Sequence, residues 1–207
     1  MKELLVATTN PAKLAEYRLL LREFDLKLIS LHDAAIEQTA PEEAASFAEN
    51  ARLKARFYFD LTGIPTLADD GGLEVDALDG APGVRSHRWL GIANPDDRML
   101  AEAVIRRMAG VAPEQRSARI RAAAALVRLE RGVPRETLAE AALEGIIADR
   151  CYREVRAGFP YRSVLWLPER GCYLAELSDD EAAQLSQRRT AIEQLAAELM
   201  SLAAPSD

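Results

Sequence analysis

The chain has 207 residues, 49% of them hydrophobic, so it is long enough to bury one sizeable core or a core shared by two lobes. Its formal net charge of -7 excludes a sequence-independent nucleic-acid binder, which would need a basic face to displace counterions. No apolar run approaches the ~18 residues of a membrane span, and the first apolar run is too short for a signal peptide. We therefore expect a cytoplasmic protein that binds neither a nucleic acid polymer nor a membrane.

Strands and helices alternate through the first half of the chain. Residues 3–7 form a predicted strand, and Asn10 followed by Pro11 is a typical helix start, with Asn as the N-cap and Pro at the first helical position. A second strand is predicted over 26–31. Pro41 begins a second helical region, which ends before Gly63.

The second half begins with a helix and continues mainly as strands. Asn94 and Pro95 predict the start of a third helix. Residues 117–147 are Ala-rich, which favours helix, but their apolar residues alternate with a period of two, and we favour strands. Short strands are predicted over 163–167 and 172–177, and a capping box, Ser178 to Glu181, begins a C-terminal helix. This order predicts an α/β fold whose mixed sheet includes an all-strand lobe.

Two adjacent carboxylates, Asp69 and Asp70, stand between an apolar run and two glycines, Gly71 and Gly72. Two like charges at the end of a buried strand are costly unless a cation or a proton holds them. The glycines would allow a ligand or backbone to approach closely. The pattern indicates a metal site at the mouth of a sheet, and the alternative is an acidic turn.

Lysines are rare, because only four of the 26 basic residues are Lys. Lys13 lies in the first turn of the first predicted helix, where backbone N–H groups and the helix dipole attract anions. Lys54 and Asn50 are four residues apart and share a helix face, with Glu43 on nearly the same face and Glu42 beside it. Ordinary surface lysines are the alternative, but two lysines and an Asp pair would suit a magnesium-bound polyphosphate.

Four segments in order resemble the inosine triphosphate pyrophosphatase family, whose members clear deaminated purine nucleotides. They are A-T-T-N-P-A-K-L-A-E (7–16), S-F-A-E-N-A-R-L-K-A (46–55), A-D-D-G-G-L-E-V-D-A-L-D-G-A-P-G-V-R-S-H-R (68–88) and L-S-D-D-E-A-A-Q-L-S-Q-R (177–188). The resemblance spans nearly the whole chain. It implies a single domain over 1–207, with an elongated mixed central sheet flanked by helices, two lobes with a cleft between them, and a homodimer.

The resemblance also implies roles for individual residues. Asp70 would be the general base and would hold Mg²⁺ together with Glu42, with Glu43 as the alternative metal ligand. Lys13 and Lys54 would bind phosphate and take part in catalysis. The remaining substrate-binding residues would be Thr8, Thr9, Asn10, Asn50, Gly71, Phe159, Tyr161, Gln187 and Arg188. The implied reaction is attack of water on the α-phosphorus of a nucleoside triphosphate, such as ITP, dITP or XTP, to give a monophosphate and pyrophosphate.

The chain departs from the family's pattern mainly where the base would be read. The family's D-D-S-G reads D-D-G-G here, so Gly71 replaces a serine, and G-F-G-Y-D-P reads G-F-P-Y-R-S, so Arg162 replaces a carboxylate. Gln187 stands where the family has His, while Phe159 and Tyr161 remain as aromatic surfaces for a base. The alternatives are a shifted base preference, including another phosphoanhydride substrate, and a catalytically silent relative that binds a nucleotide.

Overall fold

The computed structural model describes residues 1–204, which form an α/β fold with seven strands in one mixed sheet and six α-helices. The strand order in the sheet is β2-β1-β3-β4-β5-β6-β7. The strands are β1 (Lys2–Val6), β2 (Leu26–Ser30), β3 (Thr66–Val75), β4 (Ser117–Glu130), β5 (Val133–Ile147), β6 (Leu165–Leu167) and β7 (Cys172–Tyr173). The helices are α1 (Pro11–Leu20), α2 (Phe47–Thr62), α3 (Asp97–Arg107), α4 (Asp179–Leu185), α5 (Gln187–Gln194) and α6 (Ala196–Ala203).

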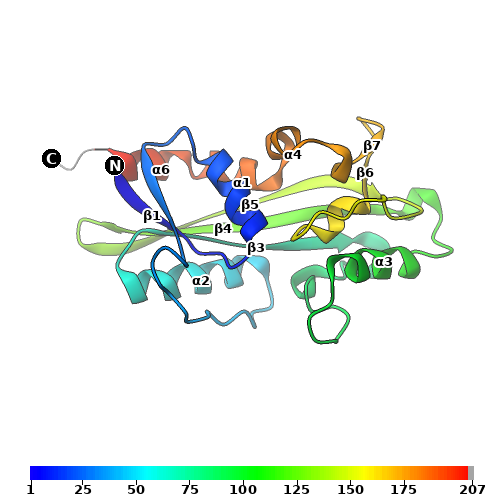
Figure 1. The fold of residues 1–207 in the computed structure, drawn as a ribbon, viewed down its shortest axis with the longest axis horizontal. Helices are drawn as coiled ribbons and strands as arrows, with labels where there is room; N and C mark the ends of the chain where they lie inside the picture. The colour runs from blue at the N-terminus through cyan, green and yellow to red at the C-terminus, as the bar shows by residue number, and fades with distance from the viewer. Residues whose placement is uncertain (205–207) are drawn as a thin grey trace. The chain divides into compact units, whose positions relative to one another are not determined.

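The chain divides into two compact units, of which the first comprises residues 1–70, 122–141 and the C-terminal segment from Arg188. In this unit β1 pairs in parallel with both β2 and β3. Figure 1 shows α2 on one face of these strands and α1 and α6 on the other. The covered strand β1 is accordingly apolar, since Leu4, Leu5 and Val6 are all buried.

The second unit comprises residues 71–121 and 142–187. Here β6 pairs antiparallel with β5 and with β7, and Figure 1 shows α3 on one face of the strands and α4 on the other. Leu100 and Val104 of α3 belong to a buried core that also includes Leu73 and Leu165. Strands β3, β4 and β5 contribute residues to both units.

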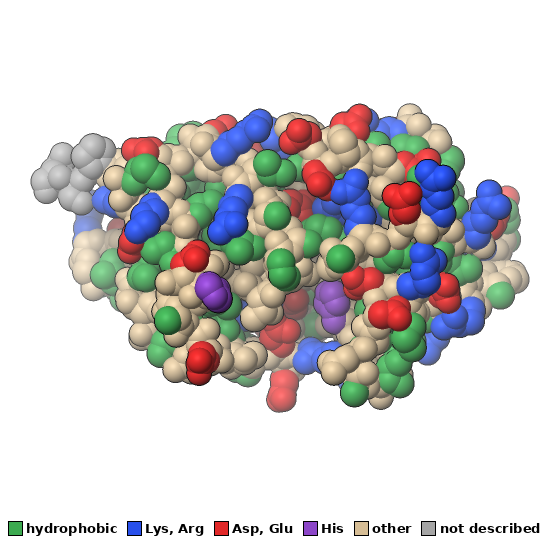
Figure 2. Space-filling view, in the orientation of Figure 1, with side chains coloured by type: hydrophobic (Ala, Val, Ile, Leu, Met, Phe, Trp, Pro, Cys, Tyr) green, Lys and Arg blue, Asp and Glu red, His purple; other side chains and the backbone are tan. Residues whose placement is uncertain are grey.

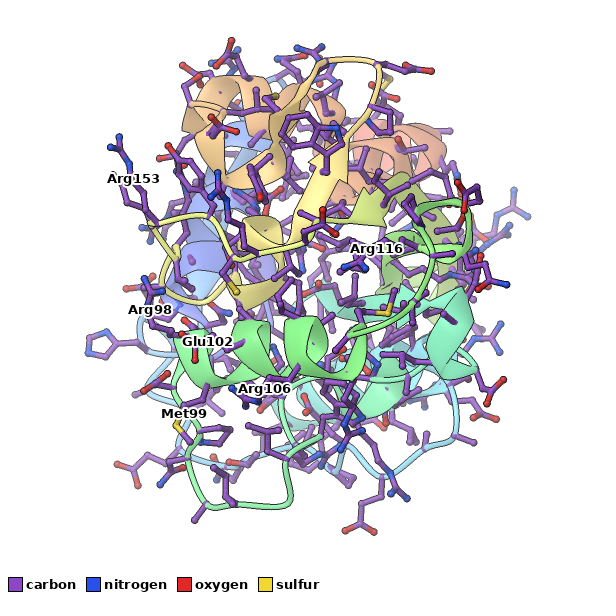
Figure 3. The ribbon with its side chains drawn as sticks, turned by 90° about the vertical axis from the view of Figure 1, so that its right-hand side faces the viewer. Arg98, Met99, Glu102, Arg106, Arg116 and Arg153 are labelled. Carbon is purple, nitrogen blue, oxygen red and sulfur yellow. The ribbon has the colours of Figure 1, made fainter. Side chains whose placement is uncertain are left out.

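Arg116 is a structural arginine of the second unit. Its guanidinium donates hydrogen bonds to the carbonyl oxygens of Ile147 (2.8 Å), Ala148 (2.8 Å), Val111 (3.1 Å) and Met108 (3.3 Å). The buried cation therefore satisfies backbone acceptors at the end of β5 and after α3. In Figure 3 it lies apart from Arg98, Glu102 and Arg106, which follow one another along α3.

Four predicted elements differ from the structure. The strand predicted over 172–177 ends at Tyr173, and Leu174–Glu176 form a short 3₁₀ helix. The segment Asp69-Asp70-Gly71-Gly72 is not a strand end followed by a turn, because β3 runs unbroken from Thr66 to Val75. Helix α2 begins at Phe47 and not near Pro41, because the Ser46 side chain caps it by accepting a hydrogen bond from the Glu49 N–H. The C-terminal helix is three helices, α4, α5 and α6.

Other predictions are confirmed. Asn10 caps α1 and Pro11 is its first residue, residues 117–147 form the long strands β4 and β5, and both hydrogen bonds of the Ser178–Glu181 capping box are present. The third helix is also present, although Asp96 caps it and not Asn94.

No helix among residues 1–204 is both long and apolar enough to cross a membrane. Figure 2 shows Lys and Arg side chains interspersed with Asp and Glu over the visible face.

Candidate active site

The turn from β1 to α1 holds Thr8, Asn10 and Lys13 in one hydrogen-bonded structure. The Asn10 N–H donates to Thr8 Oγ1 (3.2 Å), and Asn10 Oδ1 accepts from the N–H groups of Ala12 (2.9 Å) and Lys13 (3.2 Å). The Leu14 N–H donates to the Asn10 carbonyl. The first-turn N–H groups are therefore already used within the helix cap, so an anion here would be attracted by the Lys13 ammonium and the helix dipole.

Helix α2 supplies two buried polar side chains that meet Asp70. Asn50 Nδ2 donates to Asp70 Oδ2 (2.9 Å), and Asn50 Oδ1 accepts from the Ala44 N–H (3.0 Å). One turn later, Lys54 Nζ lies 2.7 Å from Glu42 Oε1 and 3.8 Å from Asp70 Oδ1. Asn50 thus orients Asp70 directly, and Lys54 places an ammonium between two carboxylates.

Glu42 and Glu43, the two alternative metal ligands, have different surroundings. Both residues precede α2 in an irregular segment, so the expectation that Glu43 shares a helix face with Asn50 is wrong. Glu42 is partly buried and paired with Lys54, whereas the Glu43 side chain is exposed. Glu42 is therefore the better candidate metal ligand.

The two adjacent Asp residues enter different surroundings because successive residues of a strand point to opposite faces. Asp69 has a fully buried side chain, and its Oδ2 lies 3.0 Å from both Lys13 Nζ and Arg188 Nε. Arg188 also contacts Glu16, with Nη1 3.2 Å from Oε2. Asp70 is partly accessible and faces Asn50 and Lys54.

The electrostatics of the pair follow these contacts. Burial raises the pKa of Asp70 above its ordinary value, although Lys54, Lys13 and the hydrogen bond from Asn50 oppose the shift. Burial would also raise the pKa of Asp69, but Lys13 and Arg188 hold it well below the ordinary range. The raised pKa of Asp70 suits its predicted role as a base, whereas contacts with two cations favour the ionised form of Asp69.

The pKa values of Lys13 and Lys54 are shifted in opposite directions. Burial lowers the pKa of Lys13, and nearby Arg188 adds to this effect while Asp69 opposes it. Burial would also lower the pKa of Lys54, but Asp70, Asp69 and Glu42 raise it above the ordinary value. A protonated Lys54 beside Asp70 is well placed to stabilise negative charge.

Three of the predicted base-reading residues, Phe159, Tyr161 and Gln187, belong to the second unit. Phe159 is half-buried, and the Arg162 guanidinium lies 3.9 Å from the centroid of its ring. Tyr161 lies within the hydrophobic core and donates a hydrogen bond to the Ser86 carbonyl, and Gln187 is buried. Of the two predicted aromatic surfaces, only Phe159 is even partly exposed.

Gly72 has a structural explanation. A Cβ at this position would overlap the Ser86 side chain and lie 2.9 Å from the Gly83 carbonyl oxygen. Ser86 Oγ in turn accepts from the Leu73 N–H (3.1 Å) and donates to Gly83 (2.7 Å). Close packing of β3 therefore requires Gly72, whereas Gly71, which directly follows Asp70 in β3, stays a predicted substrate contact.

The first unit thus brings together most of the predicted site. It contains Thr8, Thr9, Asn10, Lys13, Glu42, Asn50, Lys54, Asp70 and Arg188, with Thr9 exposed at the turn. Sequence reasoning missed Glu16, which pairs with Arg188. A signal existed, because Glu16 is three residues after Lys13 on the same face of α1 and lies next to the apolar Tyr17.

The fold and the site together define an α/β protein whose lysines and carboxylates are arranged for polyphosphate chemistry. The chain belongs to the Ham1 family, which it matches over residues 4–198. It is 37% identical to a dITP/XTP pyrophosphatase of Photobacterium profundum, covering 96% of this chain and 98% of that one. It is 39% identical to a dITP/XTP pyrophosphatase of Geobacillus kaustophilus, covering 94% and 93%.

Solved structures agree with this assignment. A HAM1 protein from Coxiella burnetii superposes with a TM-score of 0.83 at 33% sequence identity, covering 97% of this chain and 100% of that one. The resemblance read from four sequence segments is thereby confirmed at the level of family and fold.

Proposed function

We propose that this protein is a nucleoside triphosphate pyrophosphatase that hydrolyses deaminated purine nucleotides such as dITP, ITP and XTP. The relatives named dITP/XTP pyrophosphatase match along nearly their whole length, which supports this proposal. The observation that carries it is the environment of Asp70, a partly accessible carboxylate with a raised pKa held between Asn50 and Lys54.

In the proposed reaction, a water oxygen forms a bond to the α-phosphorus while the bond from that phosphorus to the bridging oxygen of the β-phosphate breaks. Asp70 accepts the proton of the water. The leaving group is pyrophosphate, and its charge is stabilised by the ammonium groups of Lys13 and Lys54. Thr8, Thr9 and Asn10 shape the turn that presents Lys13.

The residues of the first unit fit Mg²⁺ as a cofactor. Mg²⁺ is typically held by one or two carboxylates together with substrate phosphates and water. Glu42 and Asp70 offer two such carboxylates around Lys54, and residues 1–204 contain no cluster of three or more acidic, His or Cys side chains that could hold an ion alone. When bound, the ion would supply further positive charge to the phosphates.

Phe159 is the proposed stacking surface for the base. Its ring is half-buried, and Gly71, Tyr161, Gln187 and Arg188 complete the proposed substrate-binding set. Tyr161 and Arg188 are buried by protein contacts, so we assign them support of this set through packing and charge. We also place the protein in the cytoplasm, where nucleoside triphosphates are found, and expect a homodimer of single-domain chains.

A second candidate is a pyrophosphatase with a shifted base preference. It is favoured by Arg162, whose guanidinium stacks on Phe159 where the family pattern offers a carboxylate. The guanidinium of Arg162 donates hydrogen bonds where a carboxylate would accept them, so a different edge of the base would be bound. Mismatched polar groups of this kind can change selectivity between substrates by factors of ~10⁴.

The test is to incubate the protein with Mg²⁺ and a panel of triphosphates, namely dITP, XTP and the ordinary purine and pyrimidine forms, and to measure pyrophosphate release. We expect release from dITP and XTP, and a loss of about 10³-fold in kcat for Asp70→Asn. Release without purine bias would favour the second candidate. Absence of release from every nucleotide would contradict the proposed function.

A further inference from the structure

The buried carboxylate of Asp69, to which the proposed reaction gives no role, contacts both cations of a buried charge cluster. The cluster consists of Lys13, Glu16, Asp69 and Arg188, all in the first unit, and each is buried. Asp69 Oδ2 contacts both cations, and Arg188 also contacts Glu16. Two positive and two negative groups balance one another, so removing any one leaves an uncompensated buried charge.

Asp69 and Glu16 differ in their contact with Lys13, and this difference separates a structural role from a role in positioning Lys13. Both carboxylates contact the Arg188 guanidinium, at 3.0 and 3.2 Å. Only Asp69 also contacts the Lys13 ammonium, at 3.0 Å. A purely structural role would be shared by both carboxylates, whereas an effect that passes through Lys13 belongs to Asp69 alone.

The Lys13 side chain is long and flexible, and ordering it costs conformational entropy. The Lys13 backbone is fixed by the Asn10 cap, and Asp69 fixes the other end of the side chain. An ammonium held in place before the substrate arrives avoids that cost at the binding step.

We propose that Asp69 is a positioning residue that holds the Lys13 ammonium in place for the phosphate chain of the substrate. This inference rests on the proposed function of Lys13 as a phosphate ligand. Because the Asp69 side chain is fully buried, we assign it no direct contact with substrate or metal. The two Asp residues therefore have different roles, since Asp70 accepts the proton of the reacting water and Asp69 positions Lys13.

The experiment compares two isosteric variants, Asp69→Asn and Glu16→Gln, in the inhibition of dITP hydrolysis by inorganic pyrophosphate with Mg²⁺ present. We expect Asp69→Asn to raise the inhibition constant of pyrophosphate and the KM for dITP by about tenfold, the value of one lost charge-assisted contact. Glu16→Gln should change both by less than about twofold, because the contact between Lys13 and Asp69 is intact.

The Lys13→Met background shows whether the effect passes through Lys13. Adding Asp69→Asn to Lys13→Met should leave the pyrophosphate inhibition constant of Lys13→Met unchanged. An Asp69→Asn protein with a normal inhibition constant, equal effects of Asp69→Asn and Glu16→Gln, or additive effects in the double variant would each overturn the proposal.

Three further outcomes also decide the proposal or the proposed function. If Asp69→Asn does not fold, Asp69→Glu replaces it, because it keeps the charge and displaces the carboxylate by one methylene; a normal inhibition constant in that variant would overturn the proposal. If the unmodified protein releases no pyrophosphate from any triphosphate, the proposed function fails. If the unmodified protein does release pyrophosphate, and Lys13→Met weakens inhibition by pyrophosphate while Asp69→Asn does not, only the proposed role of Asp69 fails.

Discussion

Asp69 and Asp70 show how the surroundings decide the chemistry of identical side chains. The alternation of strand β3 sends Asp69 toward Lys13 and Arg188 and Asp70 toward Asn50 and Lys54. Two contacts with cations keep Asp69 ionised, whereas burial raises the pKa of Asp70. A general base requires a pKa nearer to the working pH, and this supports the proposed catalytic role of Asp70.

Substitution of Asn50 provides a direct test of what sets the pKa of Asp70. The hydrogen bond from Asn50 Nδ2 favours the ionised form of Asp70 and so lowers its pKa. Asn50→Ala removes this bond, and the pKa of Asp70 should rise further. Because the ionised form is the base, the acidic limb of the pH profile of kcat should move to higher pH, which a pH series of dITP hydrolysis measures.

The control for this prediction is Asn50→Asp. This variant keeps an acceptor for the Ala44 N–H but replaces the donor with a second negative charge near Asp70. Its acidic limb should move in the same direction and further than that of Asn50→Ala. An unchanged acidic limb of the pH profile in both variants would show that Asn50 does not affect the pKa of Asp70.

Most residues of the first unit's site could be predicted from the sequence, because motifs on three segments offer matching chemistry. The contact of Asp69 with Arg188 could not, since 119 residues separate them and no local pattern links them. The different surroundings of Glu42 and Glu43 could not be predicted either, because an irregular segment before α2 has no periodicity from which to infer a face.

At the scale of elements, the starts of α1 and α4 were predictable, whereas the caps of α2 and α3 and the unbroken course of β3 were not. Asn10 with Pro11 and the Ser178–Glu181 box mark the starts of α1 and α4 because both devices are local. The two glycines of β3 resemble a turn in the sequence, yet the strand continues through them. Gly72 is explained by packing against Ser86, 14 residues further along the chain, which no local rule reveals.

Gly72→Ala should therefore destabilise the protein. The added Cβ would overlap Ser86 and approach the Gly83 carbonyl, and overpacking of this kind costs about 2 kcal/mol. Urea unfolding of Gly72→Ala and of Gly72→Ala with Ser86→Gly measures the effect. The loss in the double variant should be smaller than the sum of the two single losses. Strict additivity would show that the overlap is relieved elsewhere.

For the whole molecule, the α/β class and the family could be predicted from the order of elements and four segments. The division into two compact units with interleaved sequence could not, because β3, β4 and β5 each contribute to both units. The first unit carries the residues proposed to cleave the phosphate chain, and the second carries Phe159 and Arg162, proposed to meet the base. Cleavage and base preference are therefore expected to respond to different substitutions.

The most direct measurement of the central claim is hydrolysis of dITP with Mg²⁺ in ¹⁸O-labelled water, followed by mass spectrometry of both products. If water activated by Asp70 attacks the α-phosphorus, the label enters the nucleoside monophosphate, and the released pyrophosphate carries none. Label in pyrophosphate, or release of inorganic phosphate with a nucleoside diphosphate, would contradict this account of the site.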